Sequence, residues 1–144
     1  MKTIDKAYQN QIDIKKSQFI CRLYPAQTEK EAKEIIKEIS EQYKDATHNC
    51  SAYYVSDGEG YDDDGEPGGT AGRPMLNVLK KNELQNSAAI VTRYFGGIKL
   101  GKNLLKNAYE QSITNFFDKN KIFFQKLCQI FHIFFSLAKQ INLF

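Results

Sequence analysis

The alternation of apolar and polar residues at the start of the chain predicts a β-hairpin. Residues 7–15 alternate apolar and polar side chains, which is typical of a half-buried strand. Residues 19–24 have strand composition and stop before Pro25, because the residue ahead of a proline is biased toward extended backbone. The residues between the two strands, 15–18, form the predicted turn.

The next apolar residues follow a helical period. Residues 28–43 place apolar side chains every three to four positions, with lysine and glutamate on the other face. Thr28 followed by Glu31 three positions later is the pattern of a capping box, so the helix is predicted to begin there. Residues 50–55 then predict a third strand, which residues 56–60 end as a turn.

Two more helices and one strand complete the pattern. Pro74 lies in the first turn of a predicted short helix, where proline is tolerated, with Thr70 or a neighbour as its cap. Residues 87–92 are apolar with little alternation, which favours a central strand. Apolar residues at helical spacing over 104–116 predict the last helix of this part of the chain.

The last part of the chain is rich in phenylalanine. Polar residues interrupt it too often for a membrane helix, which needs about 20 mostly apolar residues. The pattern instead predicts a strand over 123–133 and a short helix that continues to Phe144.

Composition sets the class of protein. A chain of 144 residues fits one domain of about 100–150 residues, and a net charge of +3 does not by itself indicate nucleic acid. The three cysteines, Cys21, Cys50 and Cys128, are scattered and odd in number, and no signal peptide opens the chain. Reduced thiols that act as small buried hydrophobic residues, in a cytoplasmic protein, are the expectation.

Two loops rich in glycine and charge are the candidate functional site, since glycine permits left-handed backbone and a close approach to a ligand. The candidates in the first loop are Asp63, Asp64, Glu66, Gly69, Thr70, Gly72 and Arg73. Those in the second are Arg93, Tyr94, Gly96, Gly97, Lys99, Gly101 and Lys102. The carboxylates lack calcium-loop spacing, because the twelfth position from Asp62 is Arg73 rather than glutamate, so no metal is predicted.

The second loop has the G-x-x-x-x-G-K spacing of a P-loop from Gly96 to Lys102. Asn103 stands where that motif needs a hydroxyl for magnesium, which argues against nucleotide hydrolysis. The remaining alternatives are that glycine amides beside Lys99 and Lys102 bind an anion at a helix start, or that the glycines only turn the chain.

Arg93 is the single residue that stands out most. At the end of the central strand it could grip a phosphate while Tyr94 or Phe95 stacks on a base. The alternative is a buried arginine paired with Asp64 or Glu66. The two histidines lie too far apart in sequence to indicate a zinc site or a triad, and no serine or cysteine lies in a nucleophile motif.

Residues 63–76 and 90–101 together resemble the two long motifs of the YigZ/IMPACT family. Residues 16–20 and 45–50 resemble the two upstream motifs of that family, so the resemblance covers about residues 5 to 115. It implies an α+β fold similar to domain 2 of ribosomal small-subunit protein five, a sandwich with a mixed sheet and helices on one face.

The resemblance also predicts how the chain divides. Residues 1–118 correspond to the family's N-terminal domain, and residues 119–144 to a truncated start of its ferredoxin-like second domain, with an aromatic tail that is exposed, swapped or covered by a partner. One departure lies after Gly101, where the family reads Thr-Gly-Gly-Leu and this chain reads Lys-Asn-Leu-Leu. The loss of two glycines predicts a stiffer loop.

The functional expectation follows from the resemblance. The family's eukaryotic member regulates translation by competing for the ribosome-associated activator of a kinase that phosphorylates an initiation factor. For this chain it implies a non-enzymatic cytoplasmic domain without a cofactor, which binds RNA, the ribosome or a translation-regulatory protein through the two glycine loops. The alternatives are a binder or enzyme for a phosphate-containing small ligand, with Asp64 and Glu66 opposite Arg73 and Arg93, and a protein–protein adaptor whose arginines are structural.

Overall fold

A computed structural model describes residues 3–117 and 133–141. Over the first range, five strands form one sheet in the order β1-β2-β5-β3-β4, and three helices pack on it. The elements are β1 (Tyr8–Ile14), β2 (Ser17–Pro25), α1 (Glu29–Gln42), β3 (His48–Val55), β4 (Gly58–Asp62), α2 (Gly72–Lys81), β5 (Ser87–Tyr94) and α3 (Lys102–Thr114).

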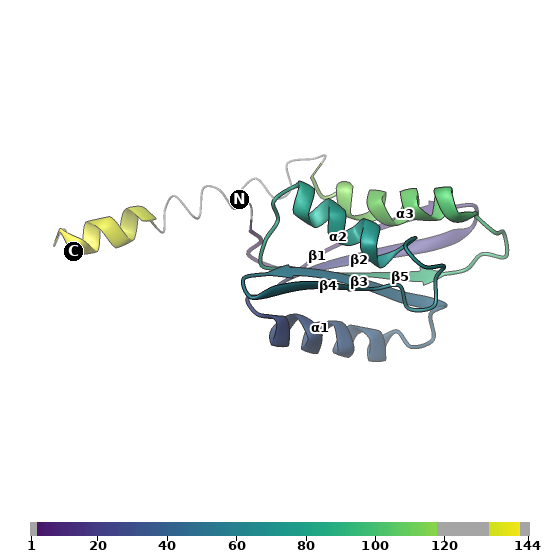
Figure 1. Cartoon of the computed structure of the whole chain (residues 1–144), viewed down its shortest axis with the longest axis horizontal. Helices are drawn as coiled ribbons and strands as arrows, with labels where there is room; N and C mark the ends of the chain where they lie inside the picture. The colour runs from purple at the N-terminus through teal and green to yellow at the C-terminus, as the bar shows by residue number, and fades with distance from the viewer. Residues whose placement is uncertain (1–2, 118–132, 142–144) are drawn as a thin grey trace.

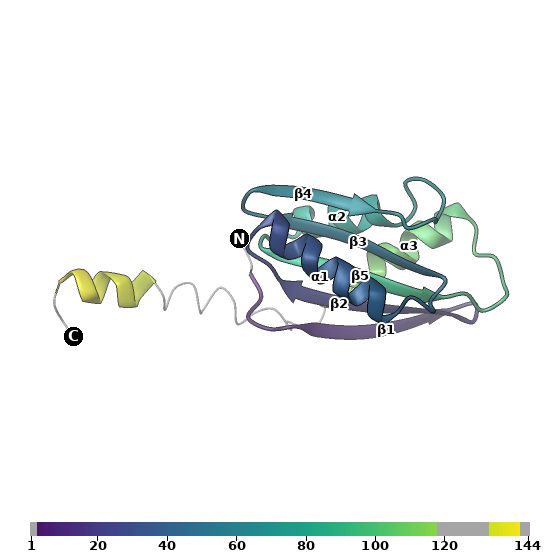
Figure 2. The same cartoon turned by 90° about the horizontal axis from the view of Figure 1, so that it is seen from below.

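The sheet lies between two layers of helix. Helices α2 and α3 cover one face and α1 covers the other (Figure 1), and α1 crosses in front of the strands when the sheet is seen from below (Figure 2). The larger core lies under α2 and α3, and a smaller one between α1 and Tyr53, Val55 and Ala88. Strand β5 is central and buried along nearly its whole length, as the sequence predicts.

The α+β class is confirmed, but two details of the predicted sheet are wrong. All four pairings are antiparallel, so the sheet is not mixed. The helix α1 carries the chain from β2 to β3, which would make a parallel pair if the two strands were neighbours. Strand β5 lies between them instead, antiparallel to both. The helices are also not confined to one face, because α1 covers residues of β3 and β5 that point away from α2 and α3.

The predicted hairpin and the first helix are confirmed. Strands β1 and β2 meet at a two-residue turn in which Lys15 and Lys16 both have positive φ, of 47° and 68°. The side chain of Thr28 accepts a hydrogen bond from the Glu31 amide at 3.2 Å, and the Glu31 carboxylate accepts one from the Gln27 amide at 2.9 Å. The Thr28 cap thus fixes the start of α1, and Glu31 completes a variant of the capping box by binding the amide one residue before the cap.

One strand is missing from the sequence prediction. Residues 56–60 are predicted to be a turn, yet only Ser56 and Asp57 turn the chain, and β4 begins at Gly58. Its glycine at position 60 fits against a neighbouring ring, because a Cβ there would lie 2.6 Å from the hydroxyl of Tyr53. Glycine in an edge strand here marks a close approach rather than a loop.

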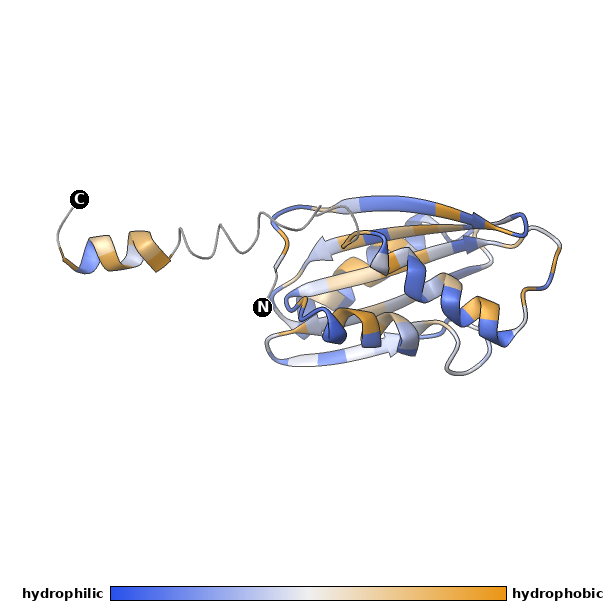
Figure 3. Cartoon of the chain, turned by 90° about the horizontal axis from the view of Figure 1, so that it is seen from above, coloured by the Kyte–Doolittle hydropathy of each residue, from blue (hydrophilic) through white to orange (hydrophobic). Residues whose placement is uncertain are grey.

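Only some of the predictions for residues after 117 can be compared with the structure, which describes residues 133–141 of that part. The predicted strand over 123–133 falls almost wholly outside the described residues, and the division at residue 118 stays a prediction. Residues 133–140 form a helix, in agreement with the predicted short helix. Figure 3 shows it largely apolar, and its exposed side chains include Ile133, Phe134 and Leu137. Within the described ranges, no helix combines the length and the apolar character needed to cross a bilayer.

Candidate functional site

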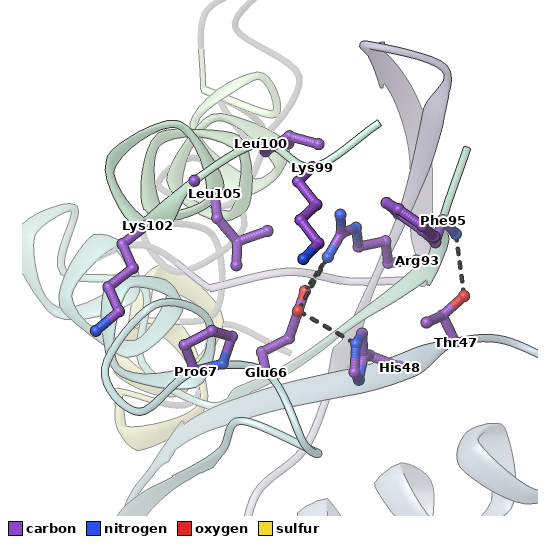
Figure 4. A pocket seen from close by; sticks show the side chains of 11 residues that line it. Thr47, His48, Glu66, Pro67, Arg93, Phe95, Lys99, Leu100, Lys102 and Leu105 are labelled. Atoms are coloured by element: carbon purple, nitrogen blue, oxygen red, sulfur yellow. Dashed lines mark hydrogen bonds and ion pairs between the residues drawn. The ribbon is translucent and has the colours of Figure 1, made fainter. Parts of the chain in front are cut away.

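A cavity of about 380 Å³ opens where β3 begins, β5 ends and α3 begins (Figure 4). We call it the basic pocket. It is lined by Thr47, His48, Glu66, Pro67, Arg93, Phe95, Lys99, Leu100, Gly101, Lys102 and Leu105. One carboxylate therefore faces an arginine and two lysines, so the charge of the lining is positive. Both glycine-rich loops contribute to the pocket, as the sequence predicts.

Glu66 forms the floor of the basic pocket, with a side chain that is only 3% exposed. The Nη1 of Arg93 donates to both of its carboxylate oxygens, at 2.9 and 2.8 Å. The hydroxyl of Tyr109 donates to Oε2 at 2.5 Å, and Nε2 of His48 lies 3.2 Å from Oε1. Two contacts on each oxygen account for the usual acceptor capacity of a carboxylate. Glu66 consequently organises its neighbours and has no lone pair left for a ligand.

His48 reaches the pocket because of strand register. It is paired with Arg93 across β3 and β5, so the two side chains emerge side by side on one face. Its Nδ1 lies 2.7 Å from the carbonyl oxygen of Asp64, which can only accept, so Nδ1 carries a hydrogen. Nε2 faces Oε1 of Glu66 across 3.2 Å. Both nitrogens of His48 are thus engaged.

Arg93 is held between two aromatic rings. Its Cζ lies 5.4 Å from the ring centroid of Phe19 and 5.5 Å from that of Phe95, and the residue is 6% exposed. The Nη2 donates weakly to Ser17 at 3.4 Å, and the buried Nε has no partner. The structure supports the alternative of a buried, paired arginine, with Glu66 as the partner.

The acidic loop is exposed over much of its length, yet its carboxylates make hydrogen bonds within the fold. The carboxylate of Asp63 accepts hydrogen bonds from the amides of Gly69, Ala71 and Gly72, at 3.1, 3.3 and 2.8 Å. It therefore caps the start of α2, a role that the sequence assigns to Thr70 or a neighbour. The Thr70 hydroxyl instead donates to the Pro67 carbonyl at 2.5 Å. Over the described ranges, no cluster of acidic, histidine or cysteine side chains is arranged to hold a metal ion.

Asp64 is also used within the loop. Its carboxylate accepts the amide hydrogen of Asn49 at 2.7 Å, which ties the loop to the start of β3. This bond holds Asp64 at the start of β3, and Arg93 forms its ion pair with Glu66 two residues later.

The second glycine loop leads into an open helix start. Gly97 and Gly101 have left-handed φ angles of 89° and 81°, so these glycines do turn the chain. Gly101 is the N-cap of α3, and no side chain caps the helix there. The first turn also contains no acidic residue, which leaves its amide groups directed outward. Lys102 and Asn103, where the family has other residues, lie within α3, so this departure does not stiffen the loop.

Lys99 and Lys102 supply the unpaired positive charge of the basic pocket. Among the described residues, neither ammonium group makes an ion pair, and both residues are exposed. Figure 4 shows Lys99 pointing toward the Arg93–Glu66 pair, while Lys102 projects from the start of α3. These two residues and the open helix end support the anion-site alternative.

Nine predicted site residues do not line the basic pocket: Asp63, Asp64, Gly69, Thr70, Gly72, Arg73, Tyr94, Gly96 and Gly97. Arg73 is exposed on α2 with its Cζ 5.6 Å from the ring of Tyr61, and it does not line the basic pocket. The hydroxyl of Tyr94 donates to Asp45 at 3.2 Å, and the residue alternates with Arg93 on β5, so it faces the other side of the sheet.

The sequence prediction also missed residues of the site. Tyr109 lies in the helical apolar stripe, which gives no sign of its bond to Glu66. His48 has a signal, because the Asp45–His48–Cys50 spacing is one of the motifs behind the family resemblance. Of the apolar walls, Pro67 and Leu100 lie within the two long motifs of the family resemblance, whereas Leu105 has only its place in the helical apolar stripe.

Burial keeps the potential nucleophiles next to the site protonated. Burial is the main cause that raises the pKa of the Cys50 thiol and of the Tyr109 hydroxyl. The Cys50 sulfur and the Tyr109 hydroxyl oxygen lie 3.3 Å apart. Burial also raises the pKa of Cys21. Both cysteines are buried, as the sequence predicts, whereas Cys128 lies outside the described residues.

These thiols predict a pH dependence of stability. In the unfolded chain a thiol ionises near pH 8.5, whereas the raised pKa keeps Cys21 and Cys50 protonated when folded. The folded state then binds more protons, so the free energy of unfolding falls as pH rises, by about 1.4 kcal/mol per pH unit for each thiol above about pH 9. Urea unfolding at several pH values up to about 10 measures this slope. The Cys21→Ala/Cys50→Ala variant should lose the contribution of the two thiols and keep only the smaller slope that tyrosines with a raised pKa, such as Tyr109, add at about pH 10. An unchanged slope would contradict the assignment.

Comparisons with known proteins identify the family and several relatives of this chain. The sequence profile described as the Impact N-terminal domain matches residues 15–117. The IMPACT family member YvyE of Bacillus subtilis is 47% identical over 133 residues, which cover 90% of this chain and 61% of that protein. The IMPACT family member YigZ of Escherichia coli is 40% identical over 102 residues, 67% of this chain and 50% of that protein. These relatives are therefore much longer than the part that this chain matches.

A solved structure, described as the crystal structure of an hypothetical protein, has a similar fold. It is 36% identical with a TM-score of 0.73, and the match covers 76% of this chain and 56% of that one.

Proposed function

We propose that this chain, which belongs to the family of the Impact N-terminal domain, is a non-enzymatic cytoplasmic domain. It acts in translational regulation and binds RNA of the ribosome through the basic pocket. The observation that carries the proposal is the unpaired charge of Lys99 and Lys102 beside an open helix start. Phosphate groups are the anions that such an arrangement of lysines and backbone amides suits.

Exposed apolar side chains next to these charges favour RNA over a free anion. Phe95 is 45% exposed and Ile98 is 42% exposed, on the loop that carries Lys99. Aromatic side chains beside phosphate-binding cations are the usual combination in proteins that bind single-stranded nucleic acid.

The groups in the pocket support a binding role rather than catalysis. Glu66 has both oxygens engaged, and His48 has both nitrogens engaged. Cys50 and Tyr109 are held protonated by burial. A general base or nucleophile needs a free lone pair within reach of a substrate.

One alternative has an observation in its favour. A cavity of about 380 Å³ is large enough for a phosphate-containing small ligand, with or without RNA. The adaptor alternative agrees with the structural role of Arg93, but it leaves Lys99 and Lys102 without a function.

Co-sedimentation with ribosomes over a salt series tests the proposed function. We expect association that weakens as salt rises, because phosphate contacts release counterions. The Lys99→Ala/Lys102→Ala variant should sediment at least about fivefold less, since each lysine contributes a phosphate contact. A matched control is Lys30→Ala/Lys37→Ala, which removes the same charge from exposed positions of α1 on the opposite face. Equal association of the two variants would contradict the proposal.

A further inference from the structure

The size and walls of the basic pocket indicate more than a phosphate site. Pro67, Phe95, Leu100 and Leu105 form its apolar walls, and its volume of about 380 Å³ is in the range of sites for small organic molecules. A phosphate group alone would leave most of this space empty. The ligand is therefore an anion attached to an apolar or planar body.

The polar groups of the pocket restrict what that body presents. Lys99, Lys102 and the first amides of α3 are all donors, whereas Glu66 has no lone pair left to accept a hydrogen bond. The hydroxyl oxygen of Thr47 accepts the Phe95 amide hydrogen at 3.0 Å and keeps one lone pair. Donors therefore outnumber free acceptors in the lining, and a ligand that mainly offers acceptors fits this set best.

Phe95 is placed as a platform between the charged groups and solvent. One side of its ring lies near the guanidinium of Arg93, at 5.5 Å, and the side chain is still 45% exposed. Beneath it, Arg93 is 94% buried, and within the described residues its Nε has no hydrogen-bond partner. Because Phe95 lines the pocket, a planar ring held in the pocket can stack against the exposed part of its phenyl group.

We infer that the basic pocket takes up a single unpaired nucleotide, with its phosphate at Lys99, Lys102 and the start of α3 and its base stacked on Phe95. This inference rests on the proposed function and specifies the kind of RNA that the site selects. A base inside a duplex is already stacked and paired, so the ligand is a single-stranded loop or end. The saturated carboxylate of Glu66 leaves little to distinguish one base from another, so all four nucleotides bind similarly.

Calorimetric titration with small probes tests the inference. The probes are the four ribonucleoside 5′-monophosphates, ribose 5-phosphate and inorganic phosphate. We expect the nucleotides to bind about tenfold or more tightly than ribose 5-phosphate, which is the contribution of one stacked base. In Phe95→Ala this difference disappears while the affinity for ribose 5-phosphate stays the same. Phe95→Leu, which keeps apolar bulk without an aromatic ring, should behave like Phe95→Ala. Lys99→Ala/Lys102→Ala weakens every probe.

Each contrary result is distinct from failure of the proposed function. Equal affinity for ribose 5-phosphate and the nucleotides, an unchanged preference in Phe95→Ala, or no binding of any probe at millimolar concentration would overturn the inference. Ribosome association that still depends on the two lysines would then leave the proposed function standing. A nucleotide preference without ribosome association would overturn the proposed function and keep the inference.

Discussion

Replacement of Arg93 by alanine is expected to lower the free energy of unfolding by about 3–5 kcal/mol, the usual cost of removing one partner of a buried ion pair. Glu66 is 3% exposed, and without Arg93 it would keep only Tyr109 and His48 to offset the loss of water. Chemical unfolding monitored by circular dichroism measures this change.

Arg73→Ala is the matched control, because the same substitution is then made at an exposed arginine outside the basic pocket. We expect it to change stability by no more than about 0.5 kcal/mol. In Arg93→Met/Glu66→Leu, both charges are gone and most of the stability should return. If Arg93→Ala were as stable as Arg73→Ala, the pair would not be structural. Because Arg93 supports the fold, the two lysines and not Arg93 are the residues with which to test binding.

Replacement of Gly96 by alanine is the second large effect, with an expected loss of about 3 kcal/mol or more. A Cβ at this position would lie 2.0 Å from the carbonyl oxygen of Lys16 and 2.2 Å from its carbonyl carbon, and both atoms are backbone. The second glycine loop therefore rests directly on the turn between β1 and β2. To accept a methyl group, one of the two segments must move.

Gly97→Ala separates this contact from backbone conformation. Gly97 has a left-handed φ of 89°, but a Cβ there would meet no atom within 4 Å. We expect a loss of only about 1–2 kcal/mol, from the unfavourable φ alone. Thermal unfolding of the two variants side by side makes the comparison. Equal losses would show that the approach to Lys16 does not constrain the loop.

Local patterns predict the elements whose signals are local. The capping box at Thr28, the hairpin turn at residues 15–16 and the buried central strand β5 all follow from neighbouring residues. The side of the sheet that α1 covers does not, because it depends on β5 entering between β2 and β3 much later in the chain. Strand β4 was missed since its glycines resemble a turn until Tyr53 is placed against one of them.

The site residues follow the same rule, because those with a local sequence signal are predicted and those set by long-range contacts are not. Lys99, Gly101 and Lys102 are predicted together and line the pocket at the start of α3, whereas Gly96 and Gly97 lie outside its lining. Arg93 pairs with Glu66, whereas Asp64 is held by the amide of Asn49. Such long-range contacts have no local sequence signal.

Similar reasons account for the site residues that were missed or misplaced. Tyr109 is 43 positions from Glu66 along the chain, and His48 is aligned with Arg93 only through strand register. Arg73 was expected near Arg93, but it lies outside the pocket on the exposed side of α2.

The most direct test of the central claim is the salt dependence of binding to a short single-stranded RNA, measured by fluorescence anisotropy for the wild type and for Lys99→Ala/Lys102→Ala. If both lysines contact phosphates in the basic pocket, the slope of log K against log salt becomes shallower by about 1.4, which is about 0.7 for each lost contact. The α1 control, Lys30→Ala/Lys37→Ala, should keep the wild-type slope. If the pocket variant kept the wild-type slope and affinity, or if both variants changed equally, the basic pocket would not be the RNA site.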